Sequence, residues 1–354
     1  MRPILDESRR AVDDAFSLEL GDPRSANAAG RKAVGILREL KARLAELLGG
    51  AEAVFFGDGD MANGMAVLSA GREALKEGRC RLVSSPVERS SVVEALRVLH
   101  REGARIDLME TDNHGRVLPG SLESLIESGT GLVVCVWAEG VSGVVQPVSE
   151  IAGMCRSAGA WLHCDACFAA GRIPVDLTAA GVDSAAVSSL QLGGPPGSAA
   201  VILRDHHPWP MNAVPEFTFS ANIPSICGMV AAMETTLAEM DTGTRIVNTL
   251  REDILSGLDS RGPTYSIIGG GLERTLPGTA LLRLNRLVDK LHLRMEDEGI
   301  VLPSHNSSRR LSFLRRTGRD ITHPDRYLGF SIDTRNTGVD IAHFVRSLTD
   351  ACGR

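Results

Sequence analysis

Lysine is scarce in this sequence of 354 residues: Lys32, Lys41, Lys76 and Lys290 are its only four. No side chain between residues 77 and 289 can therefore supply an ε-amine to form an imine with a carbonyl group. Basic charge is carried mostly by arginine, and the formal net charge is -6. Because a basic footprint is missing, nucleic acid and anionic membranes are not expected as partners.

Long apolar runs and a disulfide framework are missing as well. No apolar run approaches the ~20 residues that a membrane helix needs, and no charged-then-apolar leader opens the chain. The seven cysteines are odd in number and mostly lie in apolar runs, which indicates buried, reduced thiols. The sequence therefore predicts a soluble cytoplasmic protein.

Short apolar runs alternate with helical periods from about residue 50 to 205, which is typical of an α/β sheet covered by helices. The runs predict strands at 53–56, 81–84, 105–109, 131–137, 160–164, 185–188 and 199–203. Helices are predicted at 25–48, 90–102, 118–127, 147–158 and 223–240. The later pattern (helix 244–260, strand 279–284, helices 286–298 and 338–350) predicts a smaller α+β domain. The expected division is an N-terminal helical segment at 1–20 that packs with the small domain, a large domain at 21–240, and a small domain at 241–354.

Several short motifs follow one another in a recognisable order. They include Gly21-Asp22-Pro23-Arg24-Ser25, Asp112-x-x-Gly115-Arg116-Val117, Gly143-x-x-Gln146-Pro147, His163-x-Asp165-Ala166 and Gly171-x-x-Pro174. In this order and spacing they resemble the cysteine desulfurases, which are class V aminotransferases and pyridoxal phosphate (PLP) enzymes. The resemblance implies a PLP-transferase type I fold: a mostly parallel seven-stranded sheet flanked by helices, plus a smaller C-terminal α+β domain. It also implies a homodimer, or a heterodimer with an active homologue.

The sequence differs from this family at the positions that hold the cofactor. Gln191 stands where the resemblance places the Schiff-base lysine, and a carboxamide cannot form that bond. Gly59-Asp60 aligns with the phosphate cup, where Asp60 would repel a phosphate or act as a helix N-cap. Arg89 replaces the ring-stacking histidine, and Leu190 replaces a phosphate-contacting histidine. Phe168 stands where a glutamine contacts the cofactor's phenolic oxygen.

Three further family features have no match. Phe217-Thr218-Phe219-Ser220 aligns with a segment that reaches the neighbouring subunit's phosphate. Ser304-His305-Asn306-Ser307-Ser308 aligns with the loop of the persulfide cysteine and contains no thiol. The substrate-carboxylate arginine aligns near Leu328-Gly329. Arg309-Arg310 and Arg315-Arg316 are interpreted as surface charge, with a docking patch for an acidic partner as the alternative.

His163 and Asp165 remain as candidates for chemistry. Asp165 stands where the family pairs a carboxylate with the pyridine nitrogen, and His163 lies on the same strand face. They are candidate acid–base residues, although each is also consistent with a structural role inside the sheet. Cys164 and Cys167 have a C-x-x-C spacing and are weak candidates for a metal or redox site; packing is the competing interpretation.

The family fold would bring several acidic residues to the former cofactor cleft, namely Asp58, Asp60, Glu139 and Asp165. With Arg89 and Arg172 nearby, they are expected to bind a small amine-bearing ligand or to pair among themselves.

These differences favour a degenerate, PLP-independent family member. No cofactor is expected, PLP is allowed only without a covalent bond, and the chain is not expected to be a PLP-dependent cysteine desulfurase. The leading hypothesis is a binding or accessory protein in sulfur transfer or a biosynthetic pathway. The alternatives are an enzyme that uses His163 and Asp165 as acid and base, and a transferase or lyase that binds PLP non-covalently.

Overall fold

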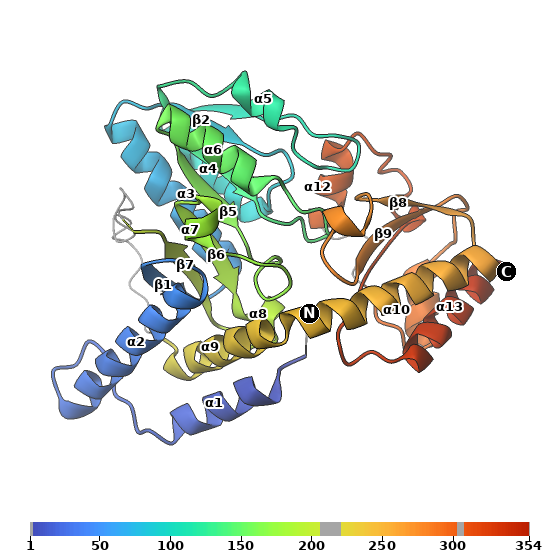
Figure 1. Cartoon of the computed structure of the whole chain (residues 1–354), viewed down its shortest axis with the longest axis horizontal. Helices are drawn as coiled ribbons and strands as arrows, with labels where there is room; N and C mark the ends of the chain where they lie inside the picture. Colours follow the sequence, from blue (N-terminus) through green and yellow to red (C-terminus); the bar gives the residue numbers. More distant parts are fainter. Residues whose placement is uncertain (1–2, 206–220, 303–307, 354) are drawn as a thin grey trace. The chain divides into compact units, whose positions relative to one another are not determined.

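The computed structural model describes residues 3–205, 221–302 and 308–353, and it divides the chain into two compact units (Figure 1). Unit 1 comprises Met1–Glu110, Val117–Trp137 and Pro147–Ala238. Unit 2 comprises Thr111–Arg116, Ala138–Gln146 and Glu239–Arg354.

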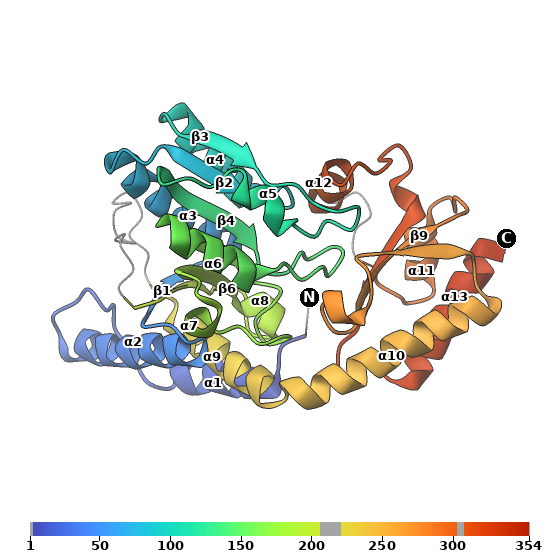
Figure 2. The same cartoon turned by 45° about the horizontal axis from the view of Figure 1, so that its top comes forward.

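A seven-stranded sheet forms the centre of unit 1, in the order β1-β7-β6-β5-β4-β2-β3 (Figure 2). Only β7 runs antiparallel to its neighbours; the other pairings are parallel. Every residue of β4, β5, β6 and β7 is buried, which explains why these strands are continuous apolar runs in the sequence. The strands are β1 (Glu52–Phe56), β2 (Arg81–Ser84), β3 (Arg105–Leu108), β4 (Thr130–Val136), β5 (Trp161–Asp165), β6 (Ser184–Ser188) and β7 (Ala199–Leu203).

Helices of unit 1 cover this sheet. They are α1 (Asp6–Phe16), α2 (Ala28–Leu47), α3 (Gly59–Lys76), α4 (Ser90–Arg101), α5 (Pro119–Glu123), α6 (Val148–Ala158), α7 (Leu177–Ala180), α8 (Ser189–Leu192) and α9 (Ile223–Ala238). Side chains of α3 and α4 share one apolar core with β2, β4 and β7. Gly71 of α3 allows close packing there, because a Cβ at this position would lie 2.3 Å from Cδ1 of Leu99 on α4.

The N-terminal helix α1 lies along α9 (Figures 1 and 2). The Ser8 hydroxyl donates a hydrogen bond to the carbonyl of Gly228 at 2.8 Å, and both residues belong to unit 1. The helix thus belongs to the large unit, and the predicted packing of residues 1–20 with the small domain stays a prediction. Helix α1 has a small buried face, and the residue of α9 that Ser8 contacts is a glycine, Gly228.

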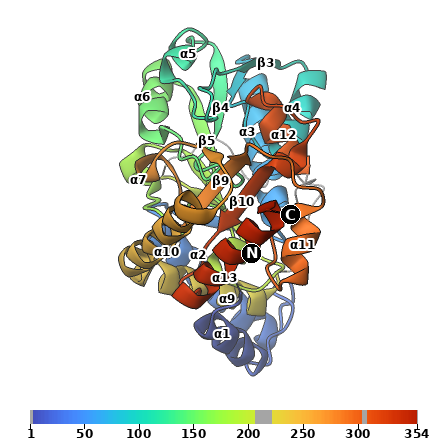
Figure 3. The same cartoon turned by 90° about the vertical axis from the view of Figure 1, so that its right-hand side faces the viewer.

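Unit 2 contains a three-stranded antiparallel sheet in the order β10-β9-β8. Helices α10 and α13 lie side by side and share an apolar core with this sheet (Figure 3). The elements are α10 (Met240–Arg261), β8 (Tyr265–Ile268), η1 (Leu272–Arg274), β9 (Thr279–Leu284), α11 (Leu291–Asp297), α12 (Ser308–Arg316), η2 (Pro324–Arg326), β10 (Tyr327–Ser331) and α13 (Gly338–Gly353). The predicted fold class, a mostly parallel sheet with a smaller α+β part, is confirmed.

Over the described part of the chain, no helix combines the length and the apolar character needed to cross a membrane.

Candidate active site

Charged side chains of unit 1 gather where its parallel strands end. Asp165 is the last residue of β5, and Ser188 is the last residue of the neighbouring β6. The loop after β2 brings Arg89 to the start of α4. Ligands of open α/β sheets bind outside the carboxyl ends of the strands, so this edge is the natural place for a site.

A buried ion pair between Arg89 and Asp165 dominates this edge. Nε of Arg89 lies 2.7 Å from Oδ2 of Asp165, and the two residues are only 7% and 2% exposed. The other carboxylate oxygen accepts a hydrogen bond from the backbone N–H of Cys167 at 3.0 Å. Burial alone would lower the pKa of Arg89, but Asp165 and the other acidic groups around it, Asp60 and Glu88 among them, together outweigh burial and the pKa is raised. The guanidinium therefore stays charged.

Asp60 makes a second and looser contact with Arg89. Its Oδ1 lies 3.4 Å from Nη1 of Arg89, and its side chain is 65% exposed. Asp60 also accepts a hydrogen bond from the Ser91 hydroxyl at 3.1 Å. The predicted N-cap role of Asp60 is wrong: Asp58 caps α3 by accepting from the backbone N–H of Met61 at 2.8 Å.

Gly59 closes the site from the side of α3. A Cβ at this position would lie 3.0 Å from both Sγ of Cys167 and Cβ of Ser188, and 3.1 Å from Nη1 of Arg89. Only glycine lets the first turn of α3 come this close to the guanidinium.

His163 is a fully buried residue with both ring nitrogens in use. Nδ1 lies 2.7 Å from the Ser184 hydroxyl and Nε2 lies 3.2 Å from Oδ1 of Asn63. The amide nitrogen of Asn63 donates to the carbonyl of Gly59, so Oδ1 is left as an acceptor and Nε2 of His163 must carry a proton. Burial lowers the pKa of His163 to about 4. The neutral ring connects β5 to α3, and this geometry favours the structural interpretation over the acid–base one.

Glu88 is a buried carboxyl group behind the ion pair. It accepts hydrogen bonds from the Ser85 hydroxyl and the Val136 backbone N–H, each at 2.6 Å. Burial raises the pKa of Glu88 to about 7; the bond from Ser85 opposes this and the charge of Asp165 adds to it. Sequence reasoning missed this residue, because a glutamate beside an arginine normally indicates a solvated pair.

Gln191 and Leu190 lie on the short helix α8 and are half-buried. The side-chain oxygen of Gln191 is buried and has no hydrogen-bond partner among the described residues. Such an acceptor is costly to leave unpaired, so a donor from a ligand would stabilise it. Phe168 is half-buried in the turn after β5.

The two cysteines of the C-x-x-C spacing lie in different surroundings. Cys164 is on β5, where Cys135 and Cys155 are among its neighbours, whereas Sγ of Cys167 lies 3.7 Å from the Asn63 amide on α3. Burial raises the pKa of both thiols well above the usual range. In the described ranges, no three His, Cys, Asp or Glu side chains are placed to hold a metal ion.

Glu139 belongs to unit 2, where its carboxylate accepts from the backbone N–H groups of Val141 and Ser142 at 2.9 and 2.7 Å. These two hydrogen bonds close the turn in which Glu139 itself lies. The predicted segments 217–220 and 304–307 lie outside the described residues.

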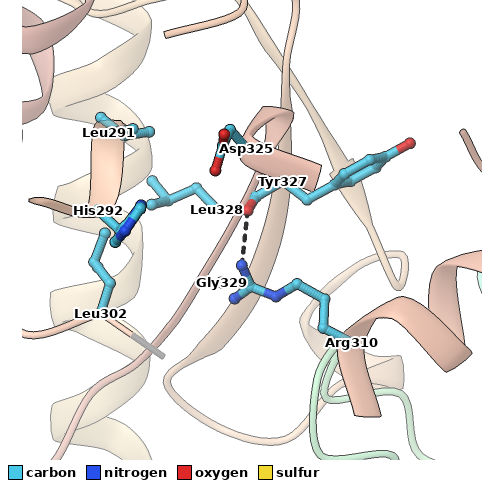
Figure 4. A pocket seen from close by; sticks show the side chains of 8 residues that line it. All are labelled: Leu291, His292, Leu302, Arg310, Asp325, Tyr327, Leu328 and Gly329. Carbon is cyan, nitrogen blue, oxygen red and sulfur yellow. Dashed lines mark hydrogen bonds between the residues drawn. The ribbon is translucent and has the colours of Figure 1, made fainter. Parts of the chain in front are cut away.

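Unit 2 contains a small cavity beside Arg310 (Figure 4). The Arg310 side chain donates to the carbonyl of Tyr327 at 3.0 Å, and Nη2 lies 3.1 Å from the point where a Cβ on Gly329 would stand. The residue is 3% exposed, so its interpretation as surface charge is wrong. Burial lowers the pKa of Arg310 to about 10, and Asp325 opposes this. The cavity measures about 10 Å³, which is room for one water molecule.

Comparison with known proteins agrees with this architecture. A solved structure described as a NifS-like protein superposes with a TM-score of 0.88 at 23% identity, covering 98% of this chain and 96% of that one. A NifS-like protein from Rickettsia africae gives a TM-score of 0.85 at 22% identity, covering 99% and 97%. The fold is therefore that of the PLP transferases.

The chain belongs to the class V aminotransferase family, whose model matches residues 9–269. A cysteine desulfurase IscS from Anaeromyxobacter sp. (strain K) is 29% identical over 276 residues, covering 74% of this chain and 67% of the relative. Another, from Anaeromyxobacter sp. (strain Fw109-5), is 26% identical over 352 residues, covering 95% and 86%.

These findings contradict two predictions made from the sequence. The expectations that no cofactor is used and that the chain is not a PLP-dependent cysteine desulfurase conflict with the family match and with the named relatives, which point to a PLP-dependent enzyme. Both predictions were wrong because they inferred the loss of the family's chemistry from substitutions at single positions.

The side chains in the candidate site do not fit a PLP held as a Schiff base. The carboxylate of Asp165 suits a pyridine nitrogen, but in this arrangement Arg89 already lies against it at 2.7 Å. Gln191 offers a carboxamide where an amine is required, and its oxygen is an unpaired acceptor. No mechanistic step is therefore assigned to the cofactor.

Proposed function

We propose that this chain is an enzyme of sulfur metabolism that acts on a small amino acid, and that any PLP it uses is held without a Schiff base to one of its own lysines. The proposal is supported by the family and by the named relatives, which are cysteine desulfurases.

The observation that carries the substrate class is the pair of opposite charges at the strand ends. Asp165 and Asp60 offer carboxylates to an ammonium group, and Arg89 offers a guanidinium to a carboxylate. A zwitterionic amino acid carries both groups on one carbon atom. A solved neighbour of the same fold is described as SspA in complex with cysteine, with a TM-score of 0.79 at 17% identity.

The test is calorimetric titration of the purified protein with L-cysteine and L-alanine, with and without PLP, followed by a sulfide-release assay. Binding of an amino acid that is lost in Asp165→Asn supports the proposal. Arg97→Gln is the matched control, since Arg97 makes only an exposed pair with Glu94 on α4. If no amino acid binds, the proposed substrate class is wrong. If borohydride traps a PLP adduct on any lysine, the proposal that PLP is held without a Schiff base is wrong.

A binding or accessory role in sulfur transfer is the second candidate. It is favoured by the absence of lysine between residues 77 and 289, because an active homologue in a heterodimer could supply the missing amine. Light scattering of the purified chain, alone and with an intact desulfurase, distinguishes a homodimer from a mixed dimer.

A further inference from the structure

We infer that Arg89 is a built-in counter-ion that closes the candidate site, and that a ligand with a cationic or pyridine nitrogen reaches Asp165 only by displacing the guanidinium. The inference deepens the proposed function and rests on it for the location of the site. The ion pair itself, however, is a feature of the structure.

The first argument is that both carboxylate oxygens of Asp165 are engaged. Oδ2 faces Nε of Arg89 at 2.7 Å, and Oδ1 accepts from the backbone of Cys167 at 3.0 Å. The backbone contact is fixed by the turn after β5, whereas the guanidinium belongs to a side chain with several rotatable bonds. The guanidinium is therefore the partner that a ligand can replace.

The second argument is that the displaced guanidinium has a place to go. Asp60 already lies 3.4 Å from Nη1 of Arg89, and its side chain is 65% exposed. Rotation away from Asp165 would bring the charge toward Asp60 and water, so it would not be left buried and unpaired. The arrangement thus offers Arg89 two partners, one inside the site and one at its rim.

The third argument is that the fold does not need the side chain of Arg89 at its own position. Arg89 is the N-cap residue of α4, but its side chain makes no capping hydrogen bond. Its backbone is extended there, with φ of -70° and ψ of 163°. The side chain can therefore move or be replaced without unwinding the helix.

The test compares PLP binding by the wild type, Arg89→Gln and the Arg97→Gln control, followed by absorbance and by equilibrium dialysis. We expect Arg89→Gln to bind PLP at least ~10-fold more tightly than the wild type, because PLP no longer has to open the ion pair before it reaches Asp165; this factor corresponds to about 1.4 kcal/mol. Arg97→Gln should match the wild type. The double variant Arg89→Gln/Asp165→Asn should lose the gain, because the freed carboxylate is gone.

Because Arg89→Gln removes the cationic partner of a buried carboxylate, a second measurement uses the wild type and does not depend on folding of the variant. The Nε–H signal of Arg89 in ¹⁵N NMR, identified by its loss in Arg89→Lys, should shift as PLP is added. No shift at saturating PLP, or equal PLP affinity in folded Arg89→Gln and the wild type, overturns the inference. If PLP affinity is unchanged while cysteine still binds, the counter-ion role fails and the proposed function stands. If the wild type binds no amino acid but Arg89→Gln gains PLP affinity, the proposed function fails and the counter-ion role stands.

Discussion

Replacing Glu88 by glutamine should change how the stability of the protein depends on pH. The carboxyl group of Glu88 is buried between the Ser85 hydroxyl and the Val136 backbone N–H. Burial raises the pKa of Glu88 from 4.5 to about 7. The folded protein therefore keeps a proton on Glu88 in a pH range where the unfolded chain has released it.

The sign and the size of the pH effect on stability follow from the difference between the folded and unfolded pKa of Glu88. Because the folded pKa is the higher one, the stabilisation from Glu88 is fully present below pH 4.5 and is lost as the pH rises through about 7. At about 1.4 kcal/mol for each pKa unit, the contribution of Glu88 to the free energy of unfolding should fall by ~3 kcal/mol across this range. The pKa of Arg89 is raised, so this guanidinium stays charged throughout and does not reverse the trend.

His163 contributes in the opposite direction. Burial lowers its pKa from 6.5 to about 4, so its contribution to stability is present above pH 6.5 and is lost as the pH falls through 4. The pH ranges of the Glu88 and His163 effects overlap. In the wild type the two effects therefore largely cancel, and together they should change the free energy of unfolding little with pH. The difference between the wild type and Glu88→Gln isolates Glu88, because His163 is common to both.

The assay is urea denaturation of both proteins at several pH values between 4 and 8, with Glu94→Gln as an exposed control on α4. The stability of Glu88→Gln relative to the wild type should improve by ~3 kcal/mol between pH 4.5 and pH 7.5. The control should show no such trend. A difference that is constant with pH would show that Glu88 is ionised in the folded protein, and the reasoning from burial would be refuted.

Three further predictions concern the core and the site. Leu99→Ala should destabilise the protein by ~3 kcal/mol in urea denaturation, since Leu99 is fully buried against Gly71; a loss below ~1 kcal/mol would contradict this packing. His163→Gln should lower the melting temperature but leave amino acid binding intact, because His163 connects β5 to α3; lost binding at an unchanged melting temperature would restore the acid–base interpretation. Gln191→Lys should gain a borohydride-reducible PLP adduct detectable by mass spectrometry, and its absence would show that position 191 does not face the cofactor.

The central strands of unit 1, β4 to β7, were predictable because they are buried on both faces. Thr130–Val136 is buried at every residue, and a run of this kind leaves few alternatives to a central strand. The sheet of unit 2 was only partly predictable. Tyr265–Ile268 is mostly half-exposed, and Tyr327–Ser331 contains a glycine, so neither has a clear strand pattern. Their pairing with Thr279–Leu284 depends on contacts distant in sequence.

The candidate site, like the two sheets, was predictable only in part. Asp60, Arg89 and Asp165 were expected near one another, and the structure brings them together. The sequence could not give the direction of the Arg89 side chain or which of the acidic residues it pairs with; in the structure the guanidinium lies against Asp165. Arg310 was misread for a related reason. Four arginines in Arg309-Arg310 and Arg315-Arg316 look solvated, and only the fold shows that Arg310 is buried.

The ion pair also sets an order of events for any ligand of the proposed site. A ligand cation cannot approach Asp165 at 2.7 Å while Nε of Arg89 holds that position, so opening of the pair must precede or accompany binding. The measured affinity is then the intrinsic affinity multiplied by the fraction of molecules with the pair open. A zwitterion recovers part of that cost, because its carboxylate can follow the guanidinium while its ammonium takes Asp165. A ligand with only the cationic group recovers less, and for this reason the site as built favours an amino acid over a simple amine.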